Sequence, residues 1–89
     1  MEFKEFVTKM QNLKRRSVPA IRRELEKFNK QIDLSDAIDA LDQFEYIERS
    51  DYEDYQDYKE ERESFWQEFL DVLEEIQYDQ EQAKTYSID

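Results

Sequence analysis

The fold is decided by one long segment, residues 51–82, which reads DYEDYQDYKEERESFWQEFLDVLEEIQYDQEQ. It contains no proline or glycine, and its apolar side chains recur at the spacing of one face of an α-helix. At a rise of about 1.5 Å per residue, this helix would be about 48 Å long. Ser50 and Glu53 match a capping box at its start. The expected inner face consists of Tyr55, Tyr58, Phe65, Phe69, Val72 and Ile76, widened by Trp66, Leu70 and Leu73.

Three shorter helices are predicted before this segment, because apolar residues recur there at steps of three and four. The first covers residues 3–16, the second follows Ser17 as its N-cap and ends at a break near Asn29 to Leu34, and the third covers residues 37–47. The second of them has a heptad seam, formed by Val18, Ile21, Leu25, Phe28 and Ile32. The sequence therefore predicts an all-α fold, a small helical bundle of three shorter helices plus one long C-terminal helix. Residues 1–84 would form a single acidic helical domain and residues 85–89 a frayed C-terminal tail.

The composition leaves two questions open. Charged residues make up 42% of the chain and the mean hydropathy is −1.11, values typical of chains that do not fold. Six Tyr, six Phe and one Trp, together with the helical periodicity, favour a folded domain. The heptad seam and the long last helix favour a homodimer, although a monomer is compatible with the same pattern.

The absence of three residue types limits the classes of function that the chain can have. The chain has no histidine, cysteine or glycine, so it lacks the commonest general base, the thiolate nucleophile, the usual zinc ligands and phosphate-binding loops. The acidic stretch 51–63 also lacks the central glycine of an EF-hand calcium loop. We therefore expect no enzymatic activity, no catalytic residues, no cofactor and no metal site, and a protein that acts by binding.

Charge is distributed unevenly along the chain. Twenty-four Asp and Glu against 13 Lys and Arg give a net charge of −11 and a pI near 4.4. The first thirty residues hold 9 basic and 4 acidic side chains, which sum to +5, and the remaining fifty-nine hold 4 basic and 20 acidic, which sum to −16. A chain of this net charge repels naked nucleic acid and anionic membranes, so we expect neither as a direct partner.

Within the acidic part, every third position from 33 to 63 is Asp or Glu. On an α-helix a step of three places successive carboxylates about 5–6 Å apart, and like charges at that distance weaken the helix. A purely structural role does not require this cost, so the spacing predicts a surface that binds cationic groups. The acidic ladder consists of Asp33, Asp36, Asp39, Asp42, Glu45, Glu48, Asp51, Asp54, Asp57, Glu60 and Glu63.

A helix with carboxylates a few ångströms apart resembles a nucleic acid in its charge pattern. A DNA strand presents one negative charge per about 3.4 Å of helix axis, and its binding proteins meet it with Lys and Arg. In charge, size and expected helicity the chain resembles the small acidic DNA-mimic inhibitors of phages and mobile elements. That resemblance implies a stoichiometric inhibitor whose partner is a basic, nucleic-acid-binding target protein. Such targets include CRISPR effectors, restriction enzymes, nucleases and host DNA-binding proteins.

A second interpretation assigns the acids to solvation alone. Ile38, Leu41, Phe44 and Ile47 also step by three, so the position after each would be charged because it faces water. The chain would then be an antitoxin-like or immunity protein, or a phage structural or assembly module, that binds a protein partner through apolar helix faces.

Two further groups of side chains have alternative roles. Tyr52, Tyr55 and Tyr58 alternate with acidic residues and can receive Arg and Lys through cation–π contacts, or can instead cover the open end of the bundle. The seven cations between Lys14 and Lys30 can neutralise the acidic helices, within the fold or across a dimer. Direct binding of nucleic acid by these cations conflicts with the overall sign of the chain.

The start of the chain, MEFKEFVTKM, is charged throughout, and no apolar run reaches the length of a signal peptide or a membrane span. We therefore expect a cytoplasmic protein, in a bacterial or host cell, with no membrane partner.

Overall fold

The computed structural model describes the backbone of residues 2–86 and the side chains of residues 2–82. That part contains four α-helices and no strand: α1 (Phe3–Gln11), α2 (Val18–Asn29), α3 (Ser35–Arg49) and α4 (Tyr55–Tyr86). The predicted all-α fold of three shorter helices plus one long C-terminal helix is therefore confirmed. Of the predicted tail 85–89, residues 87–89 lie outside the described residues, and helix α4 extends through Tyr86.

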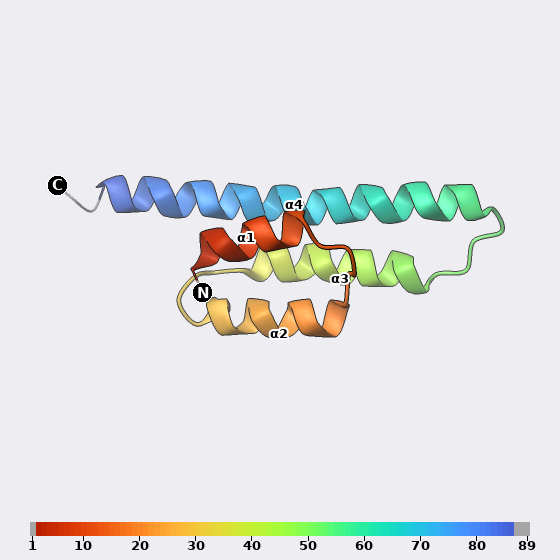
Figure 1. The fold of residues 1–89 in the computed structure, drawn as a ribbon, viewed down its shortest axis with the longest axis horizontal. Helices are drawn as coiled ribbons and strands as arrows, with labels where there is room; N and C mark the ends of the chain where they lie inside the picture. Colours follow the sequence, from red (N-terminus) through yellow and green to blue (C-terminus); the bar gives the residue numbers. More distant parts are fainter. Residues whose placement is uncertain (1, 87–89) are drawn as a thin grey trace.

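Helix α4 runs along the length of the molecule, which measures 56 × 21 × 20 Å (Figure 1). Helices α1 and α3 pack against α4, and α2 packs against α3. In Figure 1, α1 and α3 lie between α4 and α2. The short loop 50–54 joins α3 to α4, so these two helices form an antiparallel hairpin.

One apolar face of each helix contributes to a single core, and no polar or charged side chain among the described residues is fully buried. The face that α4 buries is centred on Phe69 and Leu73, because α1 as well as α3 packs on this helix. Tyr55 was predicted on the inner face but is 71% exposed, since it lies in the first turn of α4, away from the core. The core residues are Phe3, Phe6, Val7, Met10, Val18, Ile21, Leu25, Leu34, Ala37, Leu41, Phe44, Trp66, Phe69, Leu70 and Leu73.

The loop between α3 and α4 is built differently from the predicted capping box. Ser50 lies at the end of α3, where its hydroxyl donates a 2.7 Å hydrogen bond to the carbonyl of Tyr46. The residue that caps α4 is Asp54, whose Oδ1 accepts a 2.9 Å hydrogen bond from the backbone N–H of Gln56. Helix α4 therefore begins at Tyr55, four residues later than predicted from residue 51.

The first helix is shorter than predicted, and it ends at Gln11. The side-chain amide of Asn12 donates a 2.8 Å hydrogen bond to the carbonyl of Thr8, so a side chain satisfies a carbonyl of the last turn. Residues 12–17 then form a linker to α2. No helix in the described part of the chain combines the length and the apolar character that a membrane crossing requires.

Candidate functional site

The eleven residues of the acidic ladder fall on several structural elements. Five lie on α3, two on the loop 50–54 and three on α4, while Asp33 precedes α3. Each step of three residues turns about 300° around a helix axis, so the row drifts from the solvent side of α3 toward its packed side. Asp36 and Asp39 are exposed, whereas Glu45 and Glu48 are half-buried. The structure therefore divides the ladder among different surfaces.

Four ladder carboxylates form ion pairs with arginines of other helices or of the linker. Arg16 and Arg22 belong to the basic first part of the chain, so the predicted neutralisation of acidic helices by that segment is present within the fold for these two residues. The pairs are Arg16 with Glu63, Arg22 with Asp42 and Glu45, and Arg62 with Glu48.

The pair of Arg16 and Glu63 ties the linker between α1 and α2 to α4. The two groups meet in a bidentate contact in which Nη2 donates to Oε2 at 3.1 Å. The guanidinium also lies 4.8 Å from the ring centre of Trp66, a cation–π contact. The hydrogen bond from Arg16 is the main reason why the pKa of Glu63 is lowered. Glu63 is therefore already paired with a cation of its own chain.

Two other ladder residues satisfy backbone groups at helix starts. Asp54 caps α4, and Asp33 accepts hydrogen bonds from both the hydroxyl and the backbone N–H of Ser35, the first residue of α3. These two hydrogen bonds lower the pKa of Asp33. The ladder members that remain exposed, with no ion pair to a cation among residues 2–82, are Asp36, Asp39, Asp51, Asp57 and Glu60.

The three predicted tyrosines form one aromatic cluster at the tip of the hairpin. The ring of Tyr58 lies 5.6 Å from that of Tyr52 and 6.2 Å from that of Tyr55, measured between ring centres. The hydroxyl of Tyr58 donates a 2.8 Å hydrogen bond to the carbonyl of Glu48 on α3, so Tyr58 anchors the cluster. Tyr52 and Tyr55 keep 37% and 71% of their surface exposed. The sequence was therefore right to group these residues, and two of them are accessible to a partner.

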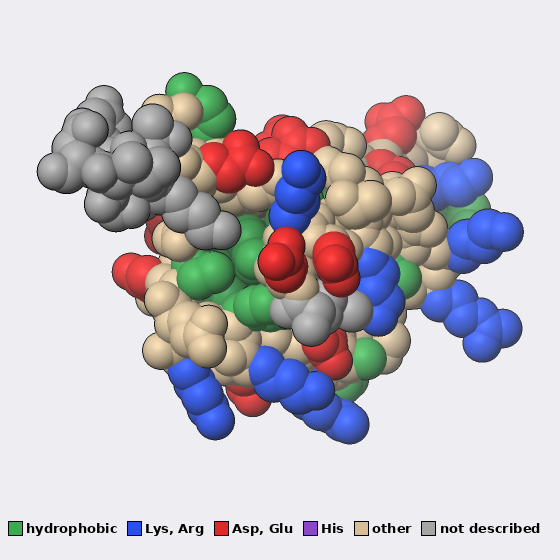
Figure 2. All heavy atoms as spheres, turned by 60° about the vertical axis from the view of Figure 1, so that its left-hand side comes forward, with side chains coloured by type: hydrophobic (Ala, Val, Ile, Leu, Met, Phe, Trp, Pro, Cys, Tyr) green, Lys and Arg blue, Asp and Glu red, His purple; other side chains and the backbone are tan. Residues whose placement is uncertain are grey.

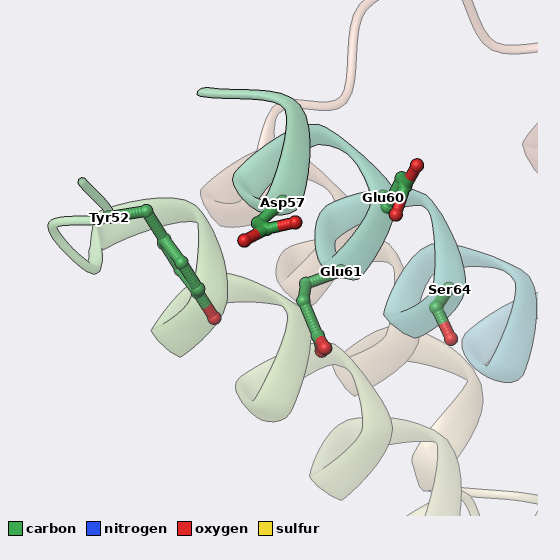
Figure 3. Close-up of a pocket in the computed structure, with 5 residues that line it drawn as sticks. All are labelled: Tyr52, Asp57, Glu60, Glu61 and Ser64. Carbon is green, nitrogen blue, oxygen red and sulfur yellow. The ribbon is translucent and has the colours of Figure 1, made fainter. Parts of the chain in front are cut away.

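Next to this cluster lies an open hollow of about 530 Å³, lined by Tyr52, Asp57, Glu60, Glu61 and Ser64. In Figure 3 the ring of Tyr52 reaches from the loop toward α4, and the carboxylates of Asp57 and Glu61 border the same space, while Glu60 points away. None of the lining residues is basic. The hollow therefore combines an aromatic wall with carboxylates, an environment that favours a cationic group.

The sequence reasoning missed a second row of acids on α4. Its members follow one another at helical spacings of three, four or seven residues and are all exposed. From residue 57 to residue 79 the row covers about 33 Å of helix axis, at a rise of about 1.5 Å per residue. Pairs of acids four residues apart, such as Asp57 and Glu61 or Asp71 and Glu75, indicate this row in the sequence. They are easily overlooked beside the continuous three-residue spacing of the acidic ladder. This α4 stripe consists of Asp57, Glu61, Glu68, Asp71, Glu75 and Asp79.

The α4 stripe lies on the side of the helix away from α1. Glu63 and Glu74 lie about 120° around the helix from the middle of the stripe, at 100° per residue. They mark the side that faces α1, because Glu63 contacts Arg16 of the linker and Glu74 accepts a hydrogen bond from Gln11 of α1. No ion pair joins a stripe residue to any cation in the described part of the chain. The stripe is therefore an accessible anionic surface with its charge uncompensated by the fold.

Negative charge is concentrated on α4. From residue 55 to residue 82 this helix carries ten acidic and two basic residues, whereas α2 carries three basic and two acidic residues, and the linker before it holds exposed Lys14 and Arg15. In Figure 2 basic side chains predominate along the lower and right-hand edges, while acidic side chains lie across the upper part and also in the centre and on the left-hand edge. A basic partner therefore meets attraction mainly on the α4 side.

No group of three or more potential metal ligands comes together in the described residues. Comparisons of the chain with protein-family models, with curated proteins and with solved structures gave no match. Geometry and charge are therefore the features of this molecule from which its function is inferred.

Proposed function

We propose that this protein is a stoichiometric inhibitor that mimics nucleic acid and occupies the basic nucleic-acid-binding groove of a target protein. CRISPR effectors, restriction enzymes, nucleases and host DNA-binding proteins are the classes of target. The observation that carries the proposal is the α4 stripe, a row of exposed carboxylates about 33 Å long that no described cation neutralises.

The spacing of the α4 stripe supports the comparison with nucleic acid. Six carboxylates over about 33 Å give a mean axial step of about 6.6 Å, close to the rise of two nucleotides in a DNA strand at about 3.4 Å each. A groove whose Lys and Arg side chains are placed for phosphates can therefore meet carboxylates at about every second position. Unlike a flexible acidic tail, a helix holds these groups in place before binding, which reduces the entropy lost on association.

The tyrosine cluster supplies a second kind of contact at one end of the stripe. Tyr52 and Tyr55 are exposed beside the hollow that contains Asp57 and Glu61. Tyrosine is common in binding hot spots, and arginine stacks on aromatic rings while it pairs with carboxylates. In this proposal the tip of the hairpin receives an arginine at the edge of the target's groove.

The alternative function is that of an antitoxin-like, immunity or phage assembly module that binds its partner mainly through apolar contacts. The two proposals differ in how the complex responds to salt and to DNA. A complex held by carboxylates and cations weakens steeply as salt increases, and duplex DNA competes for the same groove. An apolar interface resists both.

Capture from a host-cell lysate at low salt tests the proposal. The immobilised protein is washed, and bound proteins are eluted first with duplex DNA and then with a salt gradient. We expect duplex DNA to release a basic, nucleic-acid-binding protein. If bound protein instead stays through high salt and DNA releases nothing, the mimicry proposal is wrong and the alternative is favoured.

A charge-reversal variant of the α4 stripe gives the matching residue-level test. Asp57, Glu61 and Asp71 are changed to Lys, and the control variant carries Lys at Glu2, Glu5 and Glu26, exposed acids of the α1 and α2 side. Each variant moves the net charge by the same amount, from −11 to −5, because each of three substitutions adds +2. We expect the stripe variant to lose capture by at least about tenfold and the control to keep it within about threefold. An equal loss in both variants would mean that only overall charge matters.

A further inference from the structure

One face of the α3–α4 hairpin has no helix packed on it. On α4, the contacts of Glu63 and Glu74 with the linker and with α1 show which side of the helix faces α1. On α3, the ion pairs of Asp42 and Glu45 with Arg22 show which side faces α2. The remaining side of the hairpin, turned away from α1 and α2, is here called the outer face.

Acidic residues of both helices border the outer face. The rings of Phe44 and Trp66 lie 5.1 Å apart and set the register of the antiparallel pair. Asp36 and Asp39 precede Phe44 by eight and five residues, so they lie beside residues 71–74 of α4. At 100° per residue, both aspartates fall on the side of α3 away from α2. The α4 stripe borders the same face from the other helix.

Apolar side chains lie between these two acidic rims. Ala40, Phe65 and Val72 are only partly buried and pack against the core from this side. Packed helix axes are about 8–10 Å apart, and the two acidic rims lie on neighbouring helices, on either side of this apolar strip. The outer face therefore combines an apolar strip with an acidic rim on each side.

We propose that the outer face binds a basic amphipathic α-helix of the target protein. Apolar residues along the middle of such a helix would cover Phe65 and Val72, and Lys or Arg on its flanks would pair with Asp36 and with the α4 stripe. Such recognition combines burial of the apolar face of the helix with charge complementarity, which sets the orientation of the helix. The inference rests on the proposed function and deepens it, because it names the structural element that the target presents.

Two synthetic peptides of about 18 residues, which as helices are about 27 Å long, test this inference. The first is built from Ala, Leu and Lys with Leu along one face and Lys on both flanks of that face. The second has the same composition in a scrambled order, so that Leu and Lys do not segregate. Binding is measured by isothermal titration calorimetry, and peptide helicity by circular dichroism. We expect the amphipathic peptide to bind at least about tenfold more tightly, with a gain of helicity on binding.

Charge-reversal variants locate the peptide on the molecule. Asp36→Lys, Glu68→Lys and Glu75→Lys together change both rims, and the variant with Lys at Glu2, Glu5 and Glu26 is the control of equal net charge. We expect the rim variant to lose at least about tenfold in affinity for the amphipathic peptide and the control to lose less than about threefold. Substitution of exposed acids on a strongly acidic fold lowers self-repulsion, and a far-UV spectrum verifies that both variants remain helical.

Equal affinity for the two peptides, or equal losses in the two variants, would overturn the helix-binding inference. In that case, capture of a nucleic-acid-binding protein and its release by duplex DNA would still stand, and the target would meet the α4 stripe with another kind of surface. Loss of the lysate result would instead overturn the proposed function itself, so the two failures are distinguishable.

Discussion

At the residue scale, Arg16 is one of two arginines that join the basic first part of the chain to the acidic ladder, and Arg22 is the other. The side chain of Arg16 is 18% exposed, pairs with Glu63 and stacks over Trp66. Sequence spacing placed Glu63 at the end of an apparently uniform ladder, but the contact with Arg16 makes this carboxylate different from its neighbours. Glu63 has an arginine partner, whereas Glu60, one turn away, forms no ion pair with a cation among residues 2–82.

The first prediction concerns the pH dependence of this pair. The folded-state pKa of Glu63 is lowered by Arg16, so its carboxylate stabilises the fold above the ordinary value of about 4.5 and loses that contribution as pH falls through the lowered folded value. Because the Glu63 side chain is 56% exposed, we expect Glu63→Gln to reduce the free energy of unfolding by only about 0.5–1 kcal/mol at pH 7.

Urea denaturation at pH 7, 5 and 3 measures this difference, with Glu60→Gln as the control that lacks an arginine partner. The difference in stability between the wild type and Glu63→Gln should shrink from pH 7 to pH 3, since the contribution of the carboxylate is lost as pH falls through its lowered folded pKa. A difference that persists unchanged at low pH would show that side-chain packing, and not the ion pair, is responsible. The control should stay within about 0.5 kcal/mol of the wild type.

At the scale of elements, α4 is longer than the helices that pack on it. It has 32 residues, compared with 15 in α3 and 9 in α1. Its first turns contribute no fully buried side chain, so they depend on local contacts. These contacts are the hydrogen bond of Tyr58 to α3, the ion pair of Arg62 with Glu48, and the cap at Asp54. The first turns also carry Asp57 and Glu61 of the α4 stripe.

The second prediction tests the cap. We expect Asp54→Ala to reduce the free energy of unfolding by about 1 kcal/mol, because a backbone N–H of the first turn loses its acceptor. Asp54→Asn should stay close to wild type, since its amide oxygen accepts the same hydrogen bond. Chemical denaturation measures the stability, and hydrogen exchange at the amide of Gln56 reports the local effect.

Faster exchange at Gln56 in the Ala variant, with protection retained in the Asn variant, would identify the hydrogen bond as the origin of the stabilisation. If Asn is as costly as Ala, the favourable term is instead the interaction of a negative charge with the helix dipole.

At the scale of the whole molecule, the fold places α2, which carries three basic and two acidic residues, and the strongly acidic α4 on opposite sides of a body about 20 Å thick. The Debye length at physiological salt is about 8 Å, so the two sides are screened from each other. The attraction of α4 for a basic partner therefore persists although the chain carries many cations. At low salt, however, the net charge of −11 acts as a source of self-repulsion across the molecule.

The third prediction follows from this balance. We expect the melting temperature to rise by a few degrees as NaCl increases from about 20 to about 200 mM, because screening of self-repulsion outweighs the screening of exposed ion pairs, each worth about 0–1 kcal/mol. Thermal unfolding followed by circular dichroism measures the effect.

The variant with Lys at Asp36, Glu68 and Glu75 provides the comparison. Its net charge is −5, from −11 plus three changes of +2, so its melting temperature should respond less to salt. A melting temperature that falls with salt in the wild type would show that the ion pairs of Arg16, Arg22 and Arg62 dominate over self-repulsion.

Much of the fold followed from local pattern alone. The four helices, the break near Asn29 and the great length of α4 could be predicted because helix formation depends on apolar spacing, capping residues and the absence of proline and glycine. The grouping of Tyr52, Tyr55 and Tyr58 at one place also followed, since residues three apart are neighbours on a helix or in the turn that leads into one.

The roles of individual carboxylates in the acidic ladder depended on how the helices pack against one another. A run of carboxylates at a step of three looks uniform in sequence, yet its members became an ion-pair partner at Glu48, a cap at Asp54 and an exposed charge at Asp39. The difference arises because the row winds around each helix and a neighbouring helix covers only part of the circumference. The sequence by itself determined four helices and an excess of negative charge. Only the tertiary structure decided which carboxylates its own arginines neutralise and which remain on the outer side of α4, because those contacts join residues far apart in the chain.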